Sequence, residues 1–234
     1  MKKGKKDSTY QSSNHIRGTR TSAHRINNTG RKNPGKKIYQ KTTNTVYEIS
    51  GELKDMKYLI LISFAVILLA SIAAYFWNPK IDMIDEAIRT ISEYAKNLEH
   101  QNFFEIASFI FLNNIRTALI ITVIGLIPFF PLLTNISNGL IIGIVMRAKI
   151  EATKNFWTIF LVLPHGIFEI PALCIATALG LRVGLKLIGM KMNATKKDFK
   201  GILISNAVIF ATVVLPLLVI AAAIEAVVFL AKTH

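Results

Sequence analysis

The sequence is poor in the residues that disulfides, metal sites and hydrolytic catalysis require. Its 234 residues include a single cysteine, Cys174, and five histidines. Cys174 can form no disulfide within the chain and no CxxC metal motif, so we interpret it as a small buried apolar residue. His165 is the one histidine inside an apolar stretch, which leaves no candidate Ser-His-Asp group. We therefore expect no enzymatic activity, no resident cofactor and no metal.

Charged residues are also nearly absent from five long stretches of the chain. Hydrophobic residues make up 52% of the sequence, which is typical of membrane proteins. A hydrocarbon core needs about 20 apolar residues for one helical crossing. The sequence therefore predicts an all-α, polytopic transmembrane helical bundle of about five spans. These are residues 58–77, 104–127, 132–146, 156–181 and 202–230.

The segment between the first two spans, 78–102, has a different pattern. Apolar residues recur there at steps of three and four, and the acidic residues fall off that stripe. This pattern predicts an amphipathic helix, which we place on the outer membrane surface or over the bundle.

The first quarter of the chain carries most of the positive charge. Residues 1–57 hold 14 Lys and Arg but four Asp and Glu. Residues 1–42 lack apolar periodicity, so we expect a disordered basic tail, followed by a juxtamembrane segment over 43–57. No apolar run follows the first lysines closely enough for a secretory signal. The candidate membrane-surface residues are Lys2, Lys3, Lys5, Lys6, Arg31, Lys32, Lys36 and Lys37.

Three interpretations of the basic tail stay open. It can attract anionic lipid, bind RNA through phosphate neutralisation, or act as a solvated segment that only fixes topology. We favour lipid over nucleic acid because the tail has few aromatic residues for base stacking.

The basic loops indicate an orientation in the cell membrane. The positive-inside rule places the tail in the cytoplasm, and five spans then put loop 182–200 in the cytoplasm and the C-terminus outside. Loop 147–155 is basic as well and disagrees with this topology. A re-entrant third span would correct that loop but would move the more basic 182–200 loop outside.

Polar residues in the middle of apolar spans are the candidate functional residues. Arg116 and Glu169 have opposite charges at equal expected depth, and His165 lies one helical turn before Glu169. Arg116 and Glu169 form either a structural ion pair or part of a substrate or proton site. His165 and Glu169 alone supply too few ligands for a metal site. The predicted polar centre comprises Asn113, Asn114, Arg116, Asn135, Asn138, Gly139, His165, Gly166 and Glu169, and Asn206 is a further candidate.

Prolines and glycines predict how the fourth span is built. Pro164 and Pro171 flank His165-Gly166, so we expect a kinked or partly unwound helix there. Small residues at four-residue spacing, including Gly139 and Gly143, predict close helix contacts.

Two blocks of sequence resemble a known family. The stretch NNIRTALIITVIGLIPFFPLLTNISNGLIIGIV (113–145), followed by LPHGIFEIPA (163–172), resembles the stage II sporulation protein M family, archaeal members included. The resemblance covers about residues 58–230 and implies about five spans with no known enzymatic chemistry. The sporulating bacterial member is a localising partner in a complex that remodels cell wall. The matching motif residues are Asn113, Asn114, Gly139, His165, Gly166 and Glu169.

Two functional hypotheses follow. The first is a non-enzymatic membrane scaffold or localisation partner, with protein partners or further copies of itself. The alternative is a carrier of a small solute or lipid that uses Arg116, His165 and Glu169 at mid-membrane. An intramembrane enzyme is the third and least favoured possibility.

Overall fold

A computed structural model describes residues 34–77, 89, 101–155, 163–189 and 198–233. The chain divides into two compact units, Met1–Lys41 and Thr42–His234, and all transmembrane helices belong to the second. The predicted surface helix 78–102 lies outside the described residues except for Arg89, and so does most of the basic tail.

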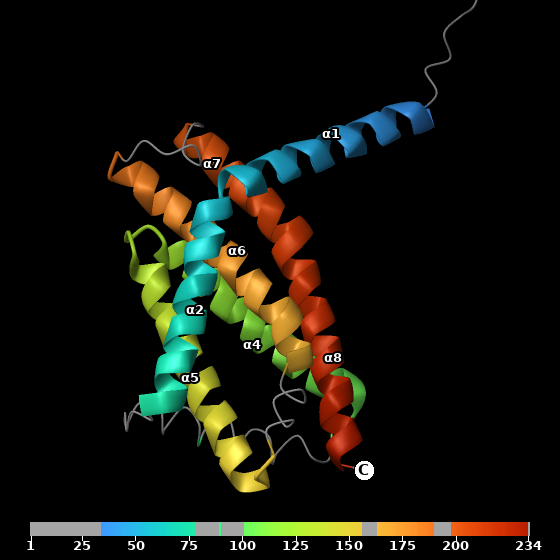
Figure 1. The fold of residues 1–234 in the computed structure, drawn as a ribbon. Coiled ribbons are helices and arrows are strands. Elements are labelled where there is room, and N and C mark those ends of the chain that lie inside the picture. Colours follow the sequence, from blue (N-terminus) through green and yellow to red (C-terminus); the bar gives the residue numbers. More distant parts are fainter. Residues whose placement is uncertain (1–33, 78–88, 90–100, 156–162, 190–197, 234) are drawn as a thin grey trace, which may run out of the picture. The chain divides into compact units, whose positions relative to one another are not determined.

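Five helical segments are long and apolar enough to cross a membrane, which confirms the predicted fold class (Figure 1). Every regular element of the described residues is a helix. The spans are α2 (Lys57–Trp77), α4 (Phe103–Ile124), α5 (Phe130–Thr153), α6 (Leu163–Leu187), and a last span built from α7 (Phe199–Ile209), η3 (Phe210–Val214) and α8 (Leu215–Thr233).

Helix α1 (Pro34–Asp55) begins earlier than the sequence predicted. The tail was expected to be disordered to residue 42, but the helix starts at Pro34, where a proline needs no hydrogen-bond donor. Near its end, Ile49 and Leu53 pack against the buried core, whereas Val46 and Tyr47 are exposed. The juxtamembrane segment is therefore the last part of a longer amphipathic helix.

The third span is a full crossing and not a short one. α5 continues to Thr153, and Arg147 lies inside it instead of in a loop. Arg147 forms an ion pair with Glu151 (2.7 Å), and its Nη1 donates to the carbonyl of Tyr75 at the end of α2 (3.1 Å). Cations are stabilised at helix C-termini. Arg147 is part of the basic charge that disagreed with the positive-inside rule, and it caps the C-terminal end of α2.

In two helix pairs, the backbones of the two helices are in direct contact. A Cβ on Gly139 would lie 2.6 Å from the Ile67 carbonyl, and one on Gly143 would contact the Ser71 carbonyl of the same helix, α2. Between α4 and α6, a Cβ on Gly180 would lie 2.7 Å from the Ile121 carbonyl. The predicted small-residue contacts are confirmed, and they fix the register of α5 on α2 and of α6 on α4.

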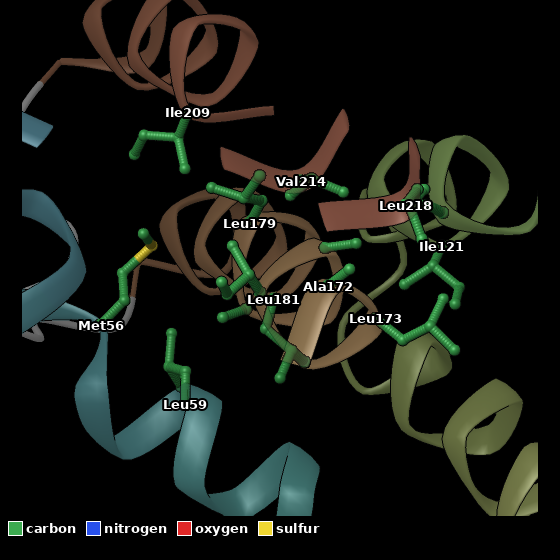
Figure 2. Close-up of a cluster of buried hydrophobic side chains, with 14 of the residues drawn as sticks. Met56, Leu59, Ile121, Ala172, Leu173, Leu179, Leu181, Ile209, Val214 and Leu218 are labelled. Carbon is green, nitrogen blue, oxygen red and sulfur yellow. The ribbon is translucent and has the colours of Figure 1, made fainter. Parts of the chain in front are cut away.

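The buried core surrounds α6 (Figure 2). Side chains from α2, α4 and the last span meet on this helix, and Figure 1 shows α6 between α2 and α8. Every residue from 172 to 185 is buried. A helix that is buried all round is expected at the centre of a bundle.

The irregular backbone lies in a different span from the one predicted. α6 is continuously α-helical through Pro171, and Pro164 is its second residue, where the missing N–H costs nothing. The last span instead widens into a π-helix at η3, where the Leu215 N–H bonds to the Phe210 carbonyl just before Pro216. The expected unwinding at His165-Gly166 was therefore wrong.

Candidate functional site

The central helix α6 makes buried or partly buried polar contacts to four other elements, and Thr122 of α4 reaches its Ala176 carbonyl. Thr177 faces α5, the Leu179 carbonyl faces α7, and Arg182 faces the end of α1. Buried polar groups in a bundle are normally paired, because an unpaired one costs about 1–3 kcal/mol. These contacts are therefore the places to look for specificity or function.

The contact to α5 joins Thr177 to Asn135. The Thr177 hydroxyl donates to Asn135 Oδ1 at 3.0 Å, and both side chains are fully buried. The register of α5 on α2 puts Ser63, also buried, level with Asn135. Asn135 Nδ2 and Asn138 Nδ2 are buried and have no hydrogen-bond partner among the residues that the structure describes. Three helices thus meet at a polar junction that retains unpaired donors.

We expect Thr177→Val to destabilise the bundle by about 1 kcal/mol, within the range measured for hydrogen bonds between membrane helices. The substitution keeps the side-chain shape but leaves Asn135 Oδ1 without its donor. Unfolding of purified protein in a detergent titration measures the loss. Thr212→Val is the matched control, because Thr212 is exposed and its hydroxyl bonds only to Val208 of its own span. Equal losses in the two variants would contradict a role for the interhelical bond.

The contact to α7 comes from Asn206, the residue that sequence reasoning named as a further candidate. Asn206 is buried, and its Nδ2 donates to the Leu179 carbonyl of α6 at 2.9 Å. Its Oδ1 has no hydrogen-bond partner in the described ranges of the chain. The bond lies one turn before η3, so it ties the central helix to the start of the irregular segment.

The contact to α1 is a buried ion pair that the sequence did not reveal. Arg182 is fully buried, and its Nη1 binds Glu52 Oε2 near the end of α1. The same nitrogen lies 3.5 Å from Met56 Sδ. Sequence reasoning placed Arg182 in a cytoplasmic loop because the predicted fourth span, residues 156–181, ended one residue before it. α6 reaches Leu187 instead, so the helix carries Arg182 into the bundle.

Arg116 and Glu169 do not form the predicted ion pair. Thr122 of α4 reaches the Ala176 carbonyl of α6, so the two residues do lie at similar depth. Arg116 is exposed, however, and no ion pair joins it to Glu169 or to another of the described residues. α4 turns Asn114 toward the interior, and two residues further along a helix is about 200° around it. Arg116 consequently points away from α6.

The other residues of the predicted polar centre are divided in the same way. Asn114, Asn135 and Gly139 are buried, Asn138 and Gly166 are half-buried, and Asn113 is exposed beside Arg116. His165 belongs to α6, but its side chain lies outside the described part of the chain. The structure therefore brings together Asn135 and Thr177, not a single Arg-His-Glu centre. The carrier alternative loses Arg116 as a member of its site.

The amino-acid sequence of these helices matches a known family. A model of the family described as stage II sporulation protein M matches residues 59–228. The chain belongs to the stage II sporulation protein M family. No curated protein and no solved structure matches the chain. The family match runs from α2 into α8 and includes Arg182, whereas Glu52 lies outside it.

Membership in the stage II sporulation protein M family, together with the five apolar helices, makes the chain a multi-pass integral membrane protein. Two motif positions have a clear structural reason. Gly139 lets α5 touch the backbone of α2, and Asn114 is the polar residue on the buried face of α4. Thr177 went unnoticed because nothing in its local sequence separates it from neighbouring residues, and Arg182 was assigned to a loop instead of a span. One sequence signal could have placed Arg182 inside the span. Small residues recur at a spacing of four at Ala172, Ala176, Gly180 and Gly184, and this spacing continues past residue 181.

Proposed function

We propose that the chain is a non-enzymatic scaffold that holds a partner protein against the outer face of α4 within the membrane. The observation that carries the proposal is Arg116, which is exposed near the middle of this span. Arg116 makes no ion pair with any described residue. A cation at this depth costs about 2.5–3.5 kcal/mol against lipid, and a partner carboxylate would remove that cost.

The face around Arg116 suits a helix of a partner protein. Leu112, Leu119 and Val123 lie on the same side of α4 at helical spacing and are exposed, so they surround the guanidinium with apolar surface. The opposite side, with Asn114 and Ala118, is buried against the bundle. An apolar face with one central cation fits a transmembrane helix that carries one Asp or Glu. The favoured partner is such a protein, and a second copy of the chain is the other outcome of the test.

The basic tail supports the same scaffold at the membrane surface. Its charge favours attachment to anionic lipid at about 1 kcal/mol for each Lys or Arg near the surface. In this proposal the N-terminus is cytoplasmic and the C-terminus extracytoplasmic, and RNA binding is the less favoured use of the tail.

A photo-reactive amino acid at position 112 tests the scaffold proposal. Leu112 is 63% exposed, and the matched control position is Leu69 of α2, which is 65% exposed near the middle of its own span. After irradiation of native membranes, we expect a protein adduct at position 112 but not at position 69. The adduct should be lost in Arg116→Gln.

Mass spectrometry of the adduct separates the outcomes. A different protein with a carboxylate in its span supports the proposal, and a doubled mass of the chain itself replaces the partner with a second copy. Absence of any adduct at position 112, in cells that express the chain at its normal level, would mean that Arg116 reaches lipid head groups instead. That result would end the scaffold proposal.

A further inference from the structure

Arg182 is a buried cation whose hydrogen-bonding capacity is mostly unused. Its residue exposure is 0%, and its Nε and Nη2 have no hydrogen-bond partner within the part of the chain that the structure describes. Of the guanidinium nitrogens, Nη1 donates to Glu52. A guanidinium presents five N–H donors in a planar fork, and such forks bind carboxylate or phosphate through two parallel bonds. The edge formed by Nε and Nη2, which is suited to a two-point contact, therefore has no hydrogen-bond acceptor among the described residues.

The Nε and Nη2 edge of Arg182 lies near the start of the apolar helix α2. Arg182 contacts Met56, and α2 starts its crossing at the next residue, Lys57. Lys54 and Lys57 on either side of Met56 are exposed. Exposed lysines at this level attract anions toward the end of the bundle.

Glu52 covers Arg182 through a small packed contact at the end of α1. Only Ile49 and Leu53 of the described α1 side chains pack against the core, while their neighbours Val46, Tyr47 and Glu48 are exposed. The Glu52 side chain keeps 15% of its surface exposed, so an anion from solvent or membrane has a direction of approach. Little apolar contact has to be lost for this end of α1 to lift.

We propose that Arg182 is a phosphate-binding site and that Glu52 is its displaceable internal occupant. A phosphate group takes the Nε and Nη2 edge, replaces Glu52 as the counter-charge, and releases the end of α1 from the bundle. The phosphate belongs either to a lipid head group or to a soluble phosphate. The site is independent of the α4 face that the scaffold proposal uses.

The first experiment removes the internal occupant. Full-length Glu52→Gln and its matched control Glu48→Gln, an exposed carboxylate of the same helix, are melted in detergent with inorganic phosphate or chloride at equal ionic strength. We expect phosphate to raise the melting temperature of Glu52→Gln by about 2–4 °C more than that of Glu48→Gln. The extra rise should vanish in Glu52→Gln/Arg182→Gln. Equal rises in all three variants overturn the proposal.

The second experiment detects release of α1 with Glu52 in place and identifies the source of phosphate. Met56→Cys, in a Cys174→Ser background, puts a fully buried thiol under the end of α1. Alkylation is measured in phosphatidylcholine nanodiscs, with and without inorganic phosphate, and in phosphatidylglycerol nanodiscs. We expect several-fold faster alkylation with phosphatidylglycerol if lipid is the ligand, or with inorganic phosphate if the soluble ion is. No acceleration by either, or the same acceleration in Arg182→Gln, overturns the site.

Discussion

Gly180→Ala is expected to destabilise the bundle by about 3 kcal/mol or more, although it adds one methyl group. The new Cβ would lie 2.7 Å from the Ile121 carbonyl and 3.2 Å from Gly125 Cα, which are backbone atoms of α4 and of the residue that caps its end. Backbone cannot move aside as a side chain does, so α4 and α6 must separate and lose contact along their shared length. Overpacking of this kind costs about 1–3 kcal/mol even where side chains can adjust. Detergent unfolding and the yield of folded protein measure the effect.

Gly166→Ala is the matched control for Gly180→Ala. Both glycines belong to α6, but a Cβ on Gly166 meets nothing closer than Ile170 Cδ1 at 3.4 Å, an ordinary contact with a flexible side chain. Alanine also favours the helix by up to about 1 kcal/mol. We expect Gly166→Ala to be as stable as the natural chain or slightly more so. Equal stability of Gly166→Ala and Gly180→Ala would show that α4 and α6 do not touch as described.

The two halves of the buried ion pair are expected to respond unequally to neutralisation. In chloride buffer, Glu52→Gln leaves Arg182 buried without its counter-charge, and breaking a buried pair in this way costs about 3–5 kcal/mol. Arg182→Met removes the buried cation and fills its space with apolar atoms. Glu52 can then turn to water, because its side chain is already partly exposed. The stability order should be Arg182→Met above Glu52→Gln, measured by thermal melting of purified protein.

The double variant Glu52→Gln/Arg182→Met tests the same pair by a double-mutant cycle. Because the two residues interact, the loss in the double variant should be clearly smaller than the sum of the two single losses. A double variant whose loss equals the sum of the two single losses would mean that the residues do not interact. Glu48→Gln should leave stability unchanged, because Glu48 is exposed on the same helix.

The fold class was predicted well from the sequence, but the side of each helix on which the polar residues lie was predicted poorly. Five spans, the Gly139 and Gly143 contacts and the inward position of Asn135 follow from hydropathy and from spacing along one helix. The prediction of an Arg116–Glu169 pair rested on membrane depth alone. Depth does not indicate the direction in which a side chain points around the helix axis. The stripe of Asn114, Ala118 and Ile121 would have assigned the buried face of α4 and turned Arg116 outward.

Other features depend on contacts between distant parts of the chain. Glu52 and Arg182 are 130 residues apart, and no local pattern marks either one as a partner of the other. The expected break at His165-Gly166 failed because a proline at the start of a helix is harmless, and the position of that start could not be read from an uninterrupted apolar run. Pro216 is well inside its span, and there the backbone does widen.

The parallel contact of α2 with α5 has a consequence for synthesis in the membrane. Gly139 rests on Ile67 and Gly143 on Ser71, so each contact joins residues 72 positions apart. At about 5–20 residues per second, α2 waits roughly 4–14 seconds for its partner after it is made. During that interval, only lipid or the insertion machinery lies beside the α2 backbone carbonyls that later contact the two glycines. Nascent chains that end before residue 130 should therefore be the ones that membrane quality control recognises through α2.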